Sequence, residues 1–155
     1  NLKEYVFLNG KKLLSGQKTL INSEDSNFKT SISIVKKENQ KMIVFWQEST
    51  DRNFNFFNEL WVGKVILYLK NGNTITLIDR NLKGHNKLIE VDNTINYQRY
   101  SIYYLTPIES MKLKESDLIQ VSYKTNSTFE NGTTYLKVTC NFETIKEQIS
   151  MLDSN

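Results

Sequence analysis

Oxygen-bearing side chains alternate near the middle of the chain in a pattern that could bind a hard cation. Asp51, Asn53 and Asn55 follow the spacing with which a twelve-residue calcium loop begins. The sixth position of such a loop takes glycine for a sharp turn and the twelfth takes a bidentate glutamate, whereas this chain has Phe56 and Val62 there. The segment therefore does not predict a calcium site, and we expect no metal or other cofactor.

The same segment carries three aromatic residues at helical spacing. Phe54, Phe57 and Trp61 recur at offsets of three and four residues, with the amides Asn53 and Asn58 among them. Aromatic faces beside amide groups can hold a sugar or a peptide, although aromatic residues at this spacing also pack a helix or a turn against a sheet. We take Phe54, Phe57 and Trp61 as the candidate binding residues.

Tyrosines are concentrated in one predicted strand, where they could stack on unpaired bases. Tyr97, Tyr100, Tyr103 and Tyr104 lie close to Arg99, and aromatic rings beside a guanidinium group are typical of single-strand nucleic-acid binding. Tyrosine is also a favoured strand residue, and 20 Lys and Arg against 17 Asp and Glu give a net charge of only +3. A weak nucleic-acid-binding barrel is therefore a minor alternative.

His85 and Cys140 are the only histidine and the only cysteine of the chain. A single histidine leaves a zinc motif incomplete, because such motifs combine several His and Cys ligands. Cys140 lies among the alternate residues that form the apolar face of a predicted strand, where a thiol behaves as a small buried hydrophobic group. Neither residue predicts a catalytic nucleophile or base.

Length and composition predict one folded domain over residues 1–155. The chain is 39% apolar and 12% aromatic, with one proline and six glycines, which suits a sequence that fills a core and not a low-complexity segment. Residues 28–34 alternate apolar and polar side chains, the pattern of a strand with one buried face. Residues 42–46 are apolar at odd-numbered and even-numbered positions alike, so we expect both faces of that strand to be covered.

Two Asn-Gly dipeptides predict tight hairpins. They are Asn71-Gly72 and Asn131-Gly132. With a two-residue loop, the first hairpin places Tyr68 opposite Ile75. The second hairpin places Val121 opposite Phe142, so that the apolar rows of its two strands share a face.

Two helices are predicted. Thr106, Pro107 and Glu109 have the order of a capping threonine, a first-turn proline and a capping-box glutamate, so a short helix should follow and pack Ile108 and Met111 onto the sheet. An apolar stripe near the end of the chain predicts a C-terminal helix that covers the core: Phe142, Ile145, Ile149 and Leu152. We therefore predict a mainly β fold, an antiparallel sandwich or open barrel of about seven to eight strands with a short connecting helix and a C-terminal helix.

These observations favour, by elimination, a soluble, non-enzymatic binding or interaction domain whose partner is a protein, a peptide or a carbohydrate. The alternative is an enzyme whose carboxylates only the fold brings together, drawn from Glu48, Asp51, Glu59 and Asp79. The apolar runs are far shorter than the ~20 residues of a membrane span, so no transmembrane segment is expected. The chain begins at Asn1 and not at methionine, which favours export to the periplasm or cell surface, with the cytoplasm as the alternative.

Overall fold

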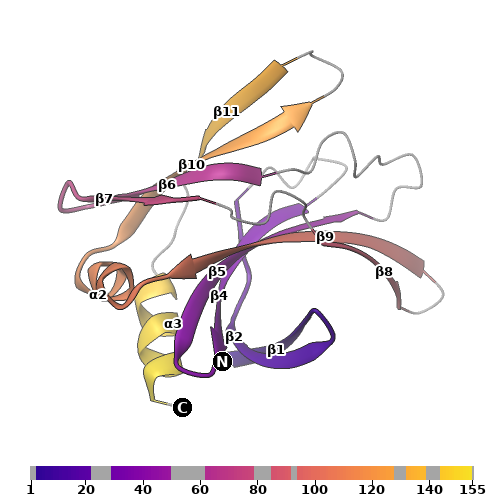
Figure 1. The fold of residues 1–155 in the computed structure, drawn as a ribbon, viewed down its shortest axis with the longest axis horizontal. Coiled ribbons are helices and arrows are strands. Elements are labelled where there is room, and N and C mark those ends of the chain that lie inside the picture. The colour runs from indigo at the N-terminus through magenta and orange to yellow at the C-terminus, as the bar shows by residue number, and fades with distance from the viewer. Residues whose placement is uncertain are drawn as a thin grey trace.

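A computed structural model describes residues 3–21, 29–49, 62–78, 85–91, 94–127, 132–138 and 144–154. These residues form two antiparallel sheets, a connecting helix and a C-terminal helix, which confirms the predicted mainly β fold (Figure 1). Apolar side chains fill the space between the two sheets, as in an open sandwich. None of the described helices is both long enough and apolar enough to cross a membrane.

The larger sheet has seven strands and the smaller has four. The larger runs in the order β1 (Lys3–Leu8), β2 (Lys11–Gly16), β4 (Lys29–Lys37), β5 (Gln40–Ser49), β9 (Thr94–Leu105) and β8 (His85–Val91), and β3 (Thr19–Leu20) also pairs with β4. The smaller runs in the order β11 (Gly132–Val138), β10 (Leu118–Ser127), β6 (Val62–Leu69) and β7 (Thr74–Leu77). The helices are α2 (Pro107–Glu115) and α3 (Thr144–Asp153).

The described residues contain eleven strands, where the sequence led us to expect seven or eight. The additional ones are β2, β3 and β8, none of which has a clear alternation of apolar and polar residues. In β2 two lysines are followed by two leucines, and β3 is only two residues long. Their partners in the sheet hold such segments in place, because local pattern is a weak determinant of strand structure.

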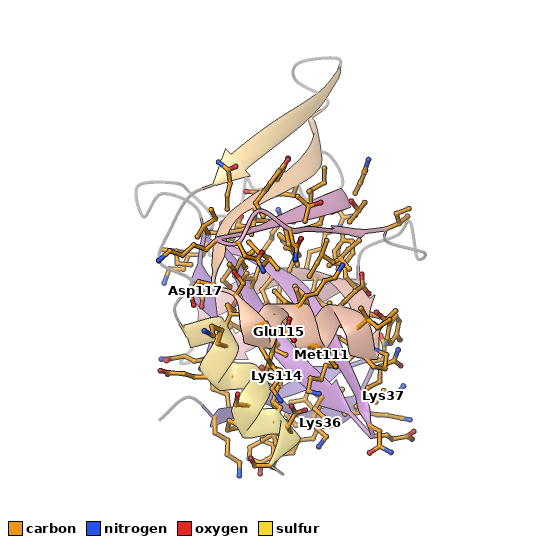
Figure 2. The ribbon with its side chains drawn as sticks, turned by 90° about the vertical axis from the view of Figure 1, so that its left-hand side faces the viewer. Lys36, Lys37, Met111, Lys114, Glu115 and Asp117 are labelled. Carbon is orange, nitrogen blue, oxygen red and sulfur yellow. The ribbon has the colours of Figure 1, made fainter. Side chains whose placement is uncertain are left out.

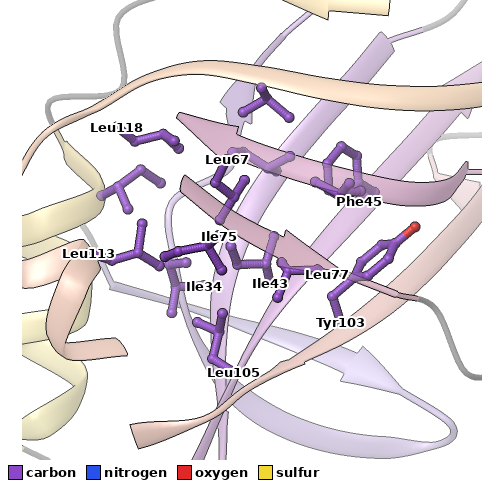
Figure 3. Close-up of a cluster of buried hydrophobic side chains, with 14 of the residues drawn as sticks. Ile34, Ile43, Phe45, Leu67, Ile75, Leu77, Tyr103, Leu105, Leu113 and Leu118 are labelled. Carbon is purple, nitrogen blue, oxygen red and sulfur yellow. The ribbon is translucent and has the colours of Figure 1, made fainter. Parts of the chain in front are cut away.

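The main core lies between the two sheets and is closed at one end by the helices (Figure 3). Ile34, Ile43 and Phe45 of the larger sheet face Leu67 and Ile75 of the smaller one. The helices add three buried residues from α3 and one from α2: Ile145, Ile149, Leu152 and Leu113. The predicted apolar stripe of the C-terminal helix is therefore confirmed for its described members.

A second core lies on the opposite face of the larger sheet. The β1–β2 hairpin curls over this face, as Figure 1 shows, and places Val6 and Leu8 against Val44 and Trp46 of β5. Tyr100 of β9 contributes its ring to the same core, and its hydroxyl both accepts a hydrogen bond from the backbone N–H of the turn residue Asn9 and donates one to the Asn9 side chain. The centre of β5 is thus covered on both faces, which confirms the expectation from residues 42–46.

The register predicted for the first hairpin is wrong by one residue. Leu67, and not Tyr68, lies opposite Ile75, and the apolar row of β6 that enters the core is the one containing Leu67. The Leu69 N–H donates to Asn73 C=O, so the loop has three residues and not two. Of these three only Gly72 has a positive φ, of 92°, which fits the three-residue hairpin loop that ends in a left-handed glycine.

The register predicted for the second hairpin is wrong by four residues. The Cα of Val121 lies opposite that of Val138, and Tyr123 lies opposite Leu136, because strand pairing already ends at Ser127 and Gly132. An even shift leaves the parity unchanged, so the two apolar rows still share a face. Phe142 lies outside the described residues.

Helix α2 begins as predicted but presents a different face to the core. Thr106 accepts a hydrogen bond from the Glu109 N–H, Glu109 accepts one from the Thr106 N–H, and proline follows the cap. Leu113 is fully buried, whereas Ile108 and Met111 are 67% and 56% exposed. The prediction that these two residues pack on the sheet is wrong, because a surface helix buries only one stripe of its circumference and in α2 that stripe contains Ser110 and Leu113.

Gln148 of α3 is fully buried at the point where the neighbour of β4 changes from β2 to β3. The pairing of β2 with β4 ends at Ser15, and that of β3 begins at Thr19. Between these points Gln148 donates from Nε2 to Gln17 C=O over 2.9 Å and accepts at Oε1 from Ile34 N–H over 3.4 Å. The side-chain amide therefore takes the place of a strand backbone in this gap of the sheet.

Asp153, the last residue of α3, connects the helix to two other elements. Its carboxylate pairs with Lys114 of α2 at 2.6 Å and with Lys41 of β5. Partial burial by itself raises the pKa of Asp153, but the hydrogen bonds and charges of the two lysines outweigh that effect and leave the pKa below its ordinary value of 3.8. The lysines also offset the repulsion between a carboxylate and the C-terminal end of a helix dipole.

We expect Asp153→Asn to reduce stability in a pH-dependent way. A carboxyl group with a lowered folded-state pKa stabilises the fold above its unfolded pKa of about 4, and this stabilisation is lost as the pH falls through the folded pKa. With Asp153 33% exposed, the loss at neutral pH should be about 1 kcal/mol or less. Urea midpoints of both proteins from about pH 7 to pH 2 should therefore converge in acid.

The matched control for this prediction is Asp117→Asn. It removes a longer ion pair, 3.6 Å from Lys146, and should change the urea midpoint less. A difference between wild type and Asp153→Asn that stayed constant over the whole pH range would show that the ion pairs do not account for it.

Candidate functional site

The residues singled out from the sequence as binding candidates, Phe54, Phe57 and Trp61, lie outside the described residues. The tyrosines of β9 do not form a continuous exposed strip. Tyr100 belongs to the core beneath the β1–β2 hairpin and Tyr103 to the core between the sheets, since alternate residues of a strand face opposite ways. Only Tyr104 is clearly exposed among the tyrosines of β9 whose side chains are described, at 51%.

Of the four carboxylates named for the alternative enzymatic function, only Glu48 lies among the described residues. Glu48 forms an ion pair with Lys18 at 2.8 Å, and the Lys18 ammonium group also lies 4.3 Å from the centre of the Trp46 ring. Asp51, Glu59, Asp79 and Cys140 lie outside the described residues, and His85 is the first residue of β8. In the part of the chain that the structure describes, no group of three or more His, Cys, Asp or Glu side chains could hold a metal ion.

An open groove of about 1670 Å³ lies on the side of the molecule that carries α2. It is lined by the end of β7, by the end of β9, by α2 along its length, by Asp153 at the end of α3, and by the β4–β5 and β1–β2 turns. Figure 2 shows this side, with Met111 and Glu115 on α2 and Lys37 at the end of β4. The groove thus brings together segments that lie more than sixty residues apart in the sequence, such as Asn9 with Thr76 and Lys37 with Met111.

Three large apolar side chains of the groove are left in contact with water. Ile78 follows β7 and is 70% exposed, Tyr104 on β9 is 51% exposed, and Met111 on α2 is 56% exposed. Met111 faces outward because α2 turns Leu113 into the core instead. Leu77 and Leu105, which also line the groove, are buried beneath this surface, so the exposed groups rest on the closed main core.

The charged side chains around the groove balance in number. The lysines are Lys11, Lys37, Lys41 and Lys114, and the acids are Glu38, Glu109, Glu115 and Asp153. Two of the lysines are paired with Asp153, and Glu109 is part of the helix cap. The described lining therefore has no strong net charge of either sign, and its lysines do not outnumber its acids as they would in a phosphate-binding surface.

The titratable side chains of the described lining are lysines and carboxylic acids, apart from Tyr104. The described lining includes neither histidine nor cysteine, and two of its acids already stabilise the fold. The strongly raised pKa of Tyr123, about 12, results from burial of that residue in the main core, away from the groove lining. An apolar floor with a balanced polar rim suits the binding of a neutral or mixed-charge surface.

Sequence reasoning missed this site. In the sequence Tyr104 is one of four tyrosines in a predicted strand, Met111 is expected in the core, and no pattern marks Ile78. The groove is assembled from parts of β7, β9, α2 and α3 and from two hairpin turns, so no single window of sequence contains its pattern. One signal in the sequence pointed to the site: Leu113 and Met111 of α2 cannot both face the core, and burial of Leu113 leaves Met111 exposed.

Comparisons of this chain with family models, with curated proteins and with solved structures find no match, so the site is characterised by its geometry alone.

Proposed function

We propose that this chain is a non-enzymatic binding domain and that the groove beside α2 is its contact site. The observation that carries the proposal is the exposure of Ile78, Tyr104 and Met111 around one concave surface. Folding alone gives no reason to place three large apolar side chains together in water, whereas a partner that covers them removes that area from solvent.

The composition of the groove favours a protein or a peptide as the partner. A nucleic acid requires an excess of cations, and the charges here are balanced. A carbohydrate is usually held by the faces of aromatic rings, but Tyr104 is the only aromatic residue of the described lining. Aliphatic and thioether side chains beside polar rim groups are typical of surfaces that bind polypeptides.

A matched pair of exposed apolar residues tests the contact site. Met111 lies in the groove, and Ile119 is 43% exposed but is not part of the lining. A displayed library of random peptides of about ten residues, the length of a strand, is selected against the wild-type chain, and the tightest peptide is synthesised. We expect Met111→Ser to weaken its binding about tenfold, since a contact near the centre of an interface contributes 1–2 kcal/mol.

The control variant, Ile119→Ser, should bind the same peptide with an affinity within about twofold of wild type. Isothermal titration calorimetry gives both dissociation constants, and urea midpoints confirm that both variants are folded. If Met111→Ser bound as wild type does while Ile119→Ser did not, the contact site would lie elsewhere and the proposal would be wrong.

A further inference from the structure

The β1–β2 hairpin presents two aromatic rings to solvent. Val6 and Leu8 of β1 point into the second core, so the residues that alternate with them, Tyr5 and Phe7, face the other way. Tyr5 is 58% exposed and Phe7 is 52% exposed. The hairpin lies on the side of the larger sheet away from the smaller sheet, as Figure 1 shows, and neither ring belongs to the groove lining. These rings therefore form a surface separate from the proposed contact site.

The hairpin also carries an excess of positive charge. From Lys3 to Gly16 the chain has three lysines and one glutamate, so two of its three net positive charges lie within the hairpin. All three lysines, Lys3, Lys11 and Lys12, are exposed. The groove lining has as many acids as lysines, whereas the hairpin has the charge to attract an anion.

Rings and cations share one face of the hairpin. The strand register places Phe7 opposite Lys12 and Tyr5 opposite Leu14, so these side chains project from the same face. The Lys12 ammonium group lies 4.8 Å from the centre of the Tyr5 ring, within the range of a cation–π contact. Residues two apart on a strand are about 7 Å apart. The face thus offers two neighbouring rings with a positive charge beside them.

We propose that the β1–β2 hairpin binds single-stranded nucleic acid, with Tyr5 and Phe7 stacking on two bases and the lysines contacting phosphates. Each unit of a nucleotide chain has one flat ring and one negative charge, and this face presents a partner for each. Proteins that bind single strands without sequence preference combine stacking rings with a cationic track. Because neither ring lines the groove, this second binding activity does not depend on the proposed function.

An anionic membrane surface would use the same charges but requires a different arrangement of apolar groups. A segment that lies in the lipid interface buries a continuous apolar face. The turn of this hairpin is formed by Asn9 and Gly10, two lysines follow it, and Val6 and Leu8 are already used in the second core. Two half-exposed rings behind a polar turn suit stacking better than insertion into lipid.

Two oligomers that differ only in their bases test the stacking contact on the unaltered protein. A fluorescently labelled deoxythymidine decamer should bind with a dissociation constant of about 100 µM or tighter at about 50 mM salt, as measured by anisotropy. A decamer of abasic units retains the phosphates and should bind at least about tenfold more weakly, because it cannot stack. Equal affinities for the two decamers, or no binding of the thymidine decamer, would contradict the proposal.

Substitutions at Phe7 distinguish a stacking ring from an apolar side chain. Phe7→Leu keeps an apolar group but removes the flat ring, so the thymidine decamer should bind about fivefold to tenfold more weakly and the abasic decamer as before. The control variant Phe7→Tyr keeps the ring and should bind within about twofold of wild type. Urea midpoints confirm that both variants are folded. If Phe7→Leu bound the thymidine decamer as wild type does, Phe7 would not stack on a base.

The salt dependence of binding tests the phosphate contacts. Lys12→Gln should reduce the slope of log association constant against log salt concentration by about 0.7, the value for one phosphate of a single strand. The control variant Lys70→Gln removes an exposed lysine that follows β6 of the smaller sheet, and it should leave the slope unchanged. Equal reductions in both variants would show that net charge, and not the hairpin, attracts the oligomer.

Two anionic probes without bases represent the rival partners. Phosphatidylglycerol vesicles represent a membrane surface, and dextran sulfate represents a polyanion of another class. Preference for the thymidine decamer over both, together with its loss in Phe7→Leu, supports the proposal. If either probe bound more tightly than the decamer and equally well to wild type and Phe7→Leu, the hairpin would be a general anionic contact and the proposal would be wrong.

Discussion

Replacing Gly16 with alanine is expected to lower the free energy of unfolding by about 1–3 kcal/mol. The new Cβ would overlap Oε1 and Cδ of Gln148, whose side chain is fully buried. Gln148 cannot move aside without giving up its hydrogen bonds to Gln17 and Ile34. Urea denaturation followed by tryptophan fluorescence measures the change in midpoint, with an unchanged m-value expected.

A double-mutant cycle shows whether this overlap is the cause. In a Gln148→Ala background the obstructing atoms are absent, so Gly16→Ala should cost less than about 0.5 kcal/mol. If the two substitutions were additive, the cost of Gly16→Ala would have to come from its own backbone and not from the contact with Gln148.

The substitution Gln148→Ala should cost about 3 kcal/mol, for two separate reasons. It leaves Ile34 N–H and Gln17 C=O without the amide that bonds them, and burying such groups unpaired costs about 1–3 kcal/mol. It also opens a cavity where the side chain was fully buried. The same urea titration measures this loss.

Gln148→Met separates these two contributions, because methionine has a similar length and fills most of the space without hydrogen bonding. We expect it to recover part of the stability lost in Gln148→Ala and still to be less stable than wild type by about 1–2 kcal/mol. A methionine variant as stable as wild type would show that the amide fills space and does not complete the sheet.

The elements that were predicted correctly are those whose cause is local. The capping residues around Pro107 specify the start of α2, since Thr106 and Glu109 satisfy each other's backbone groups within one turn. The stripe that includes Ile145 and Ile149 specifies which face of α3 is buried. The apolar run 42–46 indicated that both faces of β5 are covered, although it could not say by what.

The registers were wrong because they depend on loop conformation. The Asn71-Gly72 pair fits a two-residue turn, but here only Gly72 adopts a positive φ, and Asn71 N–H donates to Ser116 Oγ. That bond comes from a residue 45 positions away, which no local pattern encodes. The resulting shift of one residue exchanges the buried and exposed faces of β6.

The candidate site was beyond the reach of sequence reasoning for a related reason. Tyr104 and Met111 become neighbours of one groove only after β9 and α2 have packed against different parts of the molecule. Parity alone predicts that Tyr103 and Tyr104 face opposite ways, but not which of them faces water. Phe54, Phe57 and Trp61 remain a separate prediction, outside the described residues.

The insertion of Gln148 into the gap between β2 and β3 has a consequence for the order of assembly during synthesis. Its partners Gln17 and Ile34 precede it by 131 and 114 residues. A growing chain therefore emerges from the ribosome with these strands long before the amide that joins them exists. Closing so large a loop is entropically costly and slow, so a nascent chain stalled before Gln148 should leave this seam open to proteases, and only chains extended past it should resist digestion there.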